Sequence, residues 1–226
     1  MKIAVIGNGK TGSEVVKLLS EPTIYDIDNP VKVSELQQAD AAIIFVPGTA
    51  VAEILPIVME AKIPAIWGST GFDWPKNIDQ QLQQQQSKWV IAANFSLSMH
   101  LVRHCLNELK LAKKLLDTPK FHIEETHHTH KKDAPSGTAI AWQQWLDIAC
   151  DIHSKREGDI RGIHKLMLQT ADETITLQHE VHNRAIFAKG AIWAANYLVN
   201  NIQKPGLYSF AALVDKYIIE QKHATN

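Results

Sequence analysis

The residues best suited to chemistry lie in one short stretch, residues 124–139. Three histidines and two lysines fall within six residues, from His127 to Lys132, and a Pro-Ser-Gly-Thr turn follows at once. An imidazole can give or take a proton near neutral pH. A helix starting near Ser136 would add free backbone N–H groups and the positive end of its dipole, which together bind carboxylate or phosphate. The stretch therefore predicts a site for a small polyanion that also needs a proton.

This stretch connects a predicted strand to a predicted helix. Residues 120–125 alternate polar and apolar side chains, as a half-buried strand does. Residues 136–152 carry apolar side chains at the spacing of one buried helix face. Side chains on such a connection can converge on a ligand without being packed into the core.

A zinc site is an alternative interpretation of the same residues, because clustered histidines ligate zinc. We consider it the weaker one, since the two adjacent lysines would repel a cation. The ligands would be His127, His128 and His130. The histidines on other predicted strands are interpreted as structural; they are His164, His179 and His182.

A second motif, near the amino terminus, has the pattern of a dinucleotide-binding turn. A β-branched run at residues 2–6 leads directly into the turn, and a helix with apolar positions follows over residues 13–20. The residues of the turn are Gly7, Asn8, Gly9, Lys10, Thr11 and Gly12. The first glycine allows a tight turn, the second lets a pyrophosphate approach the backbone, and the third lets the helix pack closely. The alternative is a glycine turn that binds no dinucleotide.

An acidic residue follows at the distance that a dinucleotide site requires. Asp26 lies on a second predicted strand, residues 23–28, about 20 residues after the first glycine, where a carboxylate binds the ribose hydroxyls. Asp28 is a second candidate for this role. Asp26 favours NADH because a carboxylate repels a 2′-phosphate, whereas Lys10 favours NADPH. The choice between NADH and NADPH therefore stays open.

The order of the predicted elements indicates the fold class. Strands at residues 41–46, 63–67 and 89–93 alternate with helices at 49–61 and 78–86. This alternation predicts a Rossmann-type, doubly wound parallel sheet. Small residues after the strand that ends at Trp67 suit a ligand-binding crevice, although a plain turn would look the same. They are Gly68, Ser69 and Thr70.

The second half of the chain predicts a separate α+β domain with a mixed or antiparallel sheet, for substrate binding or oligomerisation. Its predicted elements are helices over 97–116, 136–152 and 184–201 and strands over 120–125, 164–170 and 174–182. We expect the helices at 136–152 and 184–201 to cover the buried face of this sheet. The predicted domains are residues 1–96 with 204–226, the last helix returning to the dinucleotide-binding domain, and residues 97–203.

Composition narrows the class of protein. The chain has 226 residues, enough for a genuine core, and a net charge of −1, which argues against a broad nucleic-acid surface. Its two cysteines, Cys105 and Cys150, are interpreted as lying on apolar helix faces and fit a reducing compartment. We find no signal peptide and no apolar run near the ~20 residues of a membrane span, so we expect a cytoplasmic protein.

With both halves in view, the chain resembles the bacterial 4-hydroxy-tetrahydrodipicolinate reductases along nearly its whole length. The most specific motif is Glu125–Ala139, which is similar to the family signature E-x-H-H-x-x-K-x-D-A-P-S-G-T-A. Residues 68–72 are similar to the family's G-T-T-G-F, and residues 92–96 to its A-x-N-F-S. Residues 183–191 are similar to S-R-x-x-F-A-x-G-A.

The resemblance implies an oxidoreductase of lysine and diaminopimelate biosynthesis that uses NADH or NADPH. Its substrate would be a cyclic dicarboxylate, and it would be a homotetramer built through the second domain's sheet. By this resemblance His127 would be the acid–base residue and Lys131 the proton donor paired with it. The substrate's carboxylates would be held by His128, Gly137 and Thr138. The cofactor would be held by Gly7, Asn8, Gly9, Lys10, Thr11, Gly12, Asp26, Gly68, Ser69, Thr70, Ala92, Ala93, Asn94 and Phe95.

Two other functions are alternatives. A catalytically silent dinucleotide-binding sensor could keep the same fold, but it would have no need of a proton donor such as His127 with Lys131 beside an anion site. A related dehydrogenase could act on aspartate or on an amino-acid semialdehyde. The dicarboxylate-binding turn at residues 135–138 favours the dipicolinate ring over these substrates.

Overall fold

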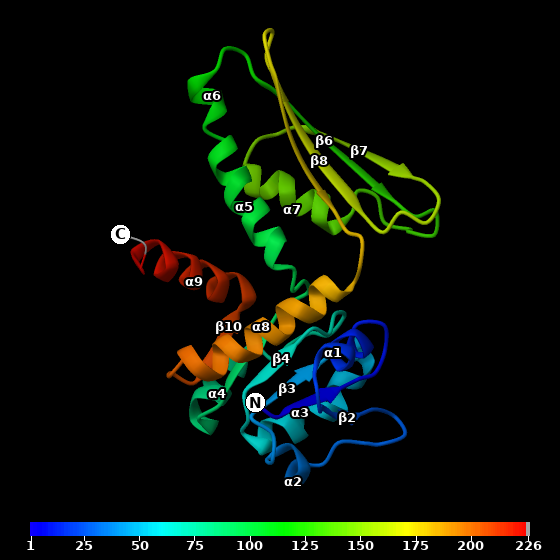
Figure 1. Cartoon of the computed structure of the whole chain (residues 1–226), viewed down its shortest axis with the longest axis vertical. Helices are drawn as coiled ribbons and strands as arrows, with labels where there is room; N and C mark the ends of the chain where they lie inside the picture. Colours follow the sequence, from blue (N-terminus) through cyan, green and yellow to red (C-terminus); the bar gives the residue numbers. More distant parts are fainter. Residues whose placement is uncertain (225–226) are drawn as a thin grey trace. The chain divides into compact units, whose positions relative to one another are not determined.

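The computed structural model describes residues 1–224, which fold into two compact units (Figure 1). The first unit combines residues 1–97 with the chain from residue 184 onward, and the second comprises residues 98–183. Among the described residues, no helix combines the length and the apolarity that a membrane crossing requires.

The first unit is built on six parallel strands in the order β10–β5–β4–β3–β1–β2. The strands are β1 (Ile3–Ile6), β2 (Thr23–Tyr25), β3 (Ala41–Ile44), β4 (Ala65–Trp67), β5 (Lys88–Ile91) and β10 (Gly206–Ser209). Every residue of β1, β3 and β4 is buried, as expected for parallel strands covered on both faces. The predicted doubly wound parallel sheet is confirmed, and β10 adds an edge strand beside β5.

Helices cover both faces of this sheet. They are α1 (Gly12–Leu18), α2 (Val33–Leu36), α3 (Gly48–Ala61), α4 (Ile78–Gln85), α8 (Ala185–Asn201) and α9 (Phe210–Ala224). Helices α1, α8 and α9 share one apolar core with the sheet, and α2, α3 and α4 share the other. Because all six strands are parallel, their carboxyl ends lie at one edge of the sheet, where doubly wound folds bind their ligands.

Helix α8 packs on the six-stranded sheet and not, as predicted, on the sheet of the second half. In Figure 1 it is drawn in orange and runs across the strands of the first unit. Small residues, including Ala188, Ala191 and Ala194, are fully buried and let the helix lie close to the sheet. Gly190 faces the Phe95 carbonyl so closely that an added Cβ would lie 1.7 Å from its oxygen. The chain therefore returns to the first unit at residue 184, not at residue 204.

The second unit contains a four-stranded mixed sheet in the order β7–β6–β8–β9. Its strands are β6 (Lys120–His127), β7 (Asp151–Arg156), β8 (Ile163–Gln169) and β9 (Thr174–Glu180). Strand β6 runs parallel to β7 and antiparallel to β8, which in turn runs antiparallel to β9. Its helices are α5 (Leu97–Leu109), α6 (Ala112–Leu115) and α7 (Gly137–Leu146). The predicted mixed sheet is confirmed.

Two further predictions for the second half of the chain are wrong. The helix expected over residues 136–152 ends at Leu146, because Asp147 adopts a left-handed conformation with φ of 53°, and β7 follows it. Neither cysteine lies on a buried helix face, since Cys105 is exposed on α5 and Cys150 follows α7. The buried face of α5 carries Met99, Val102 and Leu106 instead.

Candidate functional site

The glycine turn after β1 has the geometry of a dinucleotide-binding loop. Gly7 adopts φ of +95°, and a Cβ there would lie 2.3 Å from the Phe45 carbonyl oxygen, so that only glycine fits. A Cβ on Gly12 would lie 1.8 Å from the Gly7 carbonyl oxygen. Over Gly9, by contrast, a Cβ would meet nothing within 4 Å. The turn is therefore packed closely on its inner side and open where a pyrophosphate would approach.

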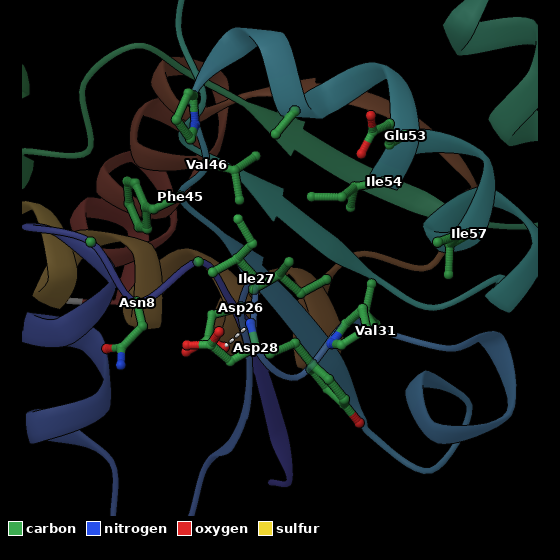
Figure 2. Close-up of a pocket in the computed structure, with 17 residues that line it drawn as sticks. Asn8, Asp26, Ile27, Asp28, Val31, Phe45, Val46, Glu53, Ile54 and Ile57 are labelled. Carbon is green, nitrogen blue, oxygen red and sulfur yellow. Dashed lines mark hydrogen bonds between the residues drawn. The ribbon is translucent and has the colours of Figure 1, made fainter.

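A cavity of about 700 Å³ lies beside this turn (Figure 2). Its walls are the glycine turn, the segment after β2, the segment after β3 and the first turns of α3. Strands β1 and β3 are neighbours in the sheet although β2 separates them in sequence. Such a switch in strand order is where doubly wound sheets bind their ligands.

Acidic and apolar side chains line this cavity. Asp26, Asp28 and Glu53 contribute the carboxylates, and Val46 and Ile54 are among the apolar residues labelled in Figure 2. Backbone N–H groups of the loop after β2 donate to Asp26 Oδ1, at 3.1 Å each, and hold its carboxylate in the loop. Sequence reasoning missed Glu53, whose only signal was its place one turn into the helix that follows β3.

The remaining residues predicted for the cofactor do not line this cavity. The ring of Phe95 packs against Phe45 and Phe210, with ring centroids 6.0 and 4.9 Å apart, and is 1% exposed, so it is a core residue. The hydroxyl of buried Ser69 accepts the Val46 N–H at 3.3 Å and holds the neighbouring loop. Outside the cavity lining lie Lys10, Thr11, Gly12, Gly68, Ser69, Thr70, Ala92, Ala93, Asn94 and Phe95. The segments that contain them follow β1, β4 and β5 at the same edge of the sheet.

The second unit contains a cluster of polar side chains around the carboxylate of Glu125, which is 0% exposed. Its Oε1 accepts hydrogen bonds from Arg156 Nη2 at 3.0 Å and from the Ser136 backbone N–H at 3.2 Å. Its Oε2 lies 2.7 Å from Nδ1 of His127 and 4.0 Å from Nε2 of His164. These partners come from β6, β7, β8 and the start of α7, so the cluster joins four elements.

Burial and charge set the protonation of this cluster. Burial alone would raise the pKa of Glu125, but hydrogen bonds from Ser136, Ser154 and Arg156 lower it to about 2. Burial lowers the pKa of His127 below 6.5, and the charge of Glu125 opposes this shift. Burial lowers the pKa of His164 to about 4. The cluster therefore combines an ionised carboxylate with two imidazoles that bind protons less readily than usual.

Lys131 lies on the loop after β6, and its amine is paired with Asp133. Its Nζ lies 2.9 and 2.8 Å from the two carboxylate oxygens of Asp133. The positive charge of Lys131 contributes to the lowered pKa of His127, because a nearby cation disfavours the protonated imidazole. His128 is half-buried, with its ring centroid 6.2 Å from that of the exposed His130.

The predicted substrate-binding turn forms the start of α7. Ser136 is the N-cap, and its hydroxyl accepts the Ala139 N–H at 3.2 Å and lies 3.1 Å from His164 Nε2. Gly137 is exposed, and a Cβ there would meet nothing within 4 Å. The first N–H groups of a helix have no partner inside it, so Gly137 and Thr138 offer donors on an open surface.

His164 belongs to this cluster, although its sequence position was interpreted as structural. Its neighbours in the cluster are Glu125 and His127, and one ligand atom of each of the three residues lies within 4.8 Å of the others. Strand pairing produces this proximity, because Glu125 and His164 face each other in the β6–β8 register. The three residues differ from the three loop histidines weighed above as a zinc site. The guanidinium of Arg156, 3.0 Å from Glu125, opposes a cation here.

The family model and the relatives that match this chain all carry the name of one kind of reductase. The family model described as "Dihydrodipicolinate reductase, C-terminus" matches residues 100–214. The 4-hydroxy-tetrahydrodipicolinate reductase of Bdellovibrio bacteriovorus is 34% identical, over 92% of this chain and 93% of the relative. The enzyme of the same name from Methanosarcina barkeri is 33% identical, over 82% of this chain and 77% of the relative.

Solved structures share the fold. A dipicolinate-bound dihydrodipicolinate reductase from Paenisporosarcina sp. TG-14 superposes with a TM-score of 0.70 at 16% identity, over 92% of this chain and 97% of that one. An aspartate semialdehyde dehydrogenase II from Vibrio cholerae superposes with a TM-score of 0.54 at 12% identity, over 89% of this chain and 99% of that one. The arrangement of a doubly wound sheet with a second α+β unit is therefore shared by reductases and dehydrogenases.

The buried imidazole of His164 predicts a stability that falls with acidification. Its folded pKa, about 4, lies below the ordinary 6.5. The unfolded chain therefore takes up the proton first, and stability is lost as pH falls from 6.5 towards 4. Between about pH 6.5 and 4.5 this loss amounts to about 2 kcal/mol. We expect His164→Gln to remove it, as measured by urea unfolding at the two pH values.

The exposed His153 on β7 provides the control for this measurement. His153→Gln should keep the wild-type dependence on pH. Equal pH dependence in His164→Gln and wild type would contradict the assigned protonation of His164.

Proposed function

The chain belongs to the dihydrodipicolinate reductase family, and we propose that it reduces 4-hydroxy-tetrahydrodipicolinate with NAD(P)H and with loss of water. Relatives with the 4-hydroxy-tetrahydrodipicolinate reductase name align over most of its length, which supports this activity. The observation that carries the proposal is the cluster around Glu125, in which a buried imidazole and an open helix start lie together on the β6–α7 connection.

We assign proton delivery to His127. The nicotinamide supplies a hydride when bound, and its addition to the substrate's conjugated imine leaves negative charge on the ring. A proton from His127 neutralises that charge. Nδ1 faces Glu125, and a Cβ on Gly162 would lie 3.2 Å from Nε2, so the glycine leaves room beside that nitrogen. A bound dicarboxylate places negative charge near the ring and raises its affinity for the proton.

We assign to Lys131 the proton-donating role beside His127, and to the start of α7 the binding of the substrate's carboxylates. The Lys131 amine adds positive charge on the same loop, and the N–H groups of Gly137 and Thr138 suit a carboxylate at the positive end of the helix dipole. His128, on the same loop, is a further candidate for binding a substrate carboxylate. The solved reductase of similar fold that is bound to dipicolinate, a ring with two carboxylates, supports a cyclic dicarboxylate as the substrate class.

We assign the cavity of the first unit to the adenosine half of NADH. The closed inner side of the glycine turn and the open space over Gly9 fit a pyrophosphate. Asp26, Asp28 and Glu53 line the cavity, and its described lining contains no lysine or arginine. These carboxylates suit ribose hydroxyls and repel a 2′-phosphate. Lys10 was the residue whose charge favoured NADPH in the sequence analysis, and it does not line this cavity.

We also propose the homotetramer and the cytoplasmic location that the resemblance implies. Strand β9 is the edge of the second sheet, and its side chains are largely exposed, including Ile175 at 40%. An exposed edge of this kind can pair with another copy of the chain.

Replacing the proposed acid should remove turnover without affecting cofactor binding. For His127→Gln we expect kcat to fall by about 10²–10⁴-fold, the usual contribution of a positioned proton donor.

For Lys131→Ala we expect a lower kcat and a higher KM, because a charge near the substrate is lost. The assay follows NADH oxidation with freshly generated dihydrodipicolinate synthase product. The control variant is His130→Gln, on the exposed part of the loop, which should keep wild-type kinetics. Full turnover in His127→Gln would remove the assigned role.

Cofactor preference follows from the carboxylates of the cavity. We expect NADH to bind at least about tenfold more tightly than NADPH, equivalent to ~1.4 kcal/mol. Asp26→Asn should narrow this ratio, since it removes charge beside the ribose. Titration of each cofactor by fluorescence measures both values without turnover. The exposed Glu60, further along α3, gives the control variant Glu60→Gln, which should keep the wild-type ratio. Equal affinities of the wild-type protein for both cofactors would contradict the assignment.

A further inference from the structure

Arg156, the last residue of β7, connects three parts of the second unit. Its Nη2 donates to Glu125 Oε1 at 3.0 Å and also to the carbonyl oxygen of Asp133. Its Nε donates to the carbonyl oxygen of Lys131 at 3.3 Å. One guanidinium therefore bonds both the buried carboxylate and the backbone of the loop that carries Lys131.

The carboxylate that Arg156 binds is the one that contacts His127. Glu125 Oε2 lies 2.7 Å from Nδ1 of His127, while Oε1 also accepts the Ser136 N–H that begins α7. The imidazole and the start of the helix thus contact the same group. A displacement of Glu125 would move both.

Among the described residues, the loop that carries Lys131 makes few other hydrogen bonds or ion pairs with the rest of the unit. The Thr129 N–H donates to the Gly158 carbonyl at 3.2 Å, and the Lys131 N–H donates within the loop to the His128 carbonyl at 3.1 Å. The Lys131–Asp133 ion pair also lies within the loop, with the Asp133 side chain 59% exposed. Arg156 therefore supplies the bonds that join residues 131–133 to the sheet.

From these contacts we propose that Arg156 is a positioning residue, whose guanidinium holds the Lys131 loop against the Glu125 carboxylate and so fixes His127 and Lys131 in one arrangement. The proposal rests on the proposed function of these two residues. Arginine is suited to this role because its planar fork binds several acceptors at fixed angles, whereas a lysine amine at the same position cannot reach all three.

The chain contains a matched pair one residue away on the same two strands. Lys155 Nζ lies 2.9 Å from Glu124 Oε2, and the two side chains are 48% and 25% exposed. Because successive side chains of a strand point to opposite faces, this pair lies on the other side of the sheet from Glu125 and Arg156. It has the same charges but no bond to the Lys131 loop.

The first experiment compares Arg156→Lys with Lys155→Arg, each of which keeps its charge. For Arg156→Lys we expect kcat to fall about 10²-fold, as misplaced groups cause, with unchanged NADH affinity. Hydrogen–deuterium exchange without substrate should be faster at the amides of residues 129–133. Lys155→Arg should leave kcat, NADH affinity and exchange at wild-type values.

The second experiment tests the contact with His127 by NMR titration of its imidazole, in Glu125→Gln and in the control Glu124→Gln. The charge of Glu125 raises the pKa of His127 against the effect of burial. Glu125→Gln should therefore lower that pKa further, and Glu124→Gln should not change it. Other charged or titratable groups close to the ring stay in place in both variants; they are Lys131, Asp133, Arg156 and His164.

These measurements separate the two proposals. Wild-type kcat in Arg156→Lys, or a lower kcat with wild-type exchange of the loop amides, would overturn the positioning role. If Arg156→Lys does not fold, an unshifted His127 pKa in Glu125→Gln still overturns the proposal, because Arg156 acts on His127 through this carboxylate. Exchange and titration need no turnover. Absence of NADH oxidation by the wild-type protein in the assay with dihydrodipicolinate synthase product, together with faster loop exchange in Arg156→Lys, would therefore reject the proposed function and leave the loop contacts supported.

Discussion

A buried carboxylate that must stay ionised is the constraint on which the second unit depends. Removing a charged group from water is costly unless other groups replace the lost hydration. For Glu125 these groups are a guanidinium and backbone and hydroxyl donors. They come from elements that are far apart in the sequence, so the carboxylate can be satisfied only when β6, β7 and the start of α7 are assembled. The same assembly brings together the groups proposed to bind substrate and move a proton.

The first unit meets a different constraint, which is steric. Its turn between β1 and α1 is so close to the loop after β3 that Gly7 and Gly12 leave no room for a Cβ. The close approach places the turn itself, Gly7 to Gly9, in the wall of the cavity. Electrostatics thus organise the proposed proton site, and close backbone packing organises the proposed cofactor site.

The sequence predicted the elements whose signals are local. Apolar β-branched runs identified β1 and β3, because strands buried on both faces need apolar residues throughout. Strand β7 was missed because its sequence, Asp151–Arg156, contains one apolar residue, Ile152, and depends on pairing with β6. Helix α8 was identified as a helix but assigned to the wrong sheet, since an apolar face does not specify what covers it. His164 joins the site through strand register, which single-strand patterns do not contain.

The spacing within residues 125–136 also has a physical basis. Strand β6 must end, the loop must turn, and α7 must begin so that the Ser136 N–H returns to the Glu125 carboxylate, 3.2 Å away after eleven residues. A residue added or removed in this loop would leave either a buried acceptor or a helix N–H without its partner, which costs about 1–3 kcal/mol. The loop histidines are neighbours in sequence, yet His130 is exposed while His127 is buried. Closure onto Glu125, and not the density of histidines, therefore decides which side chains of the motif reach the site.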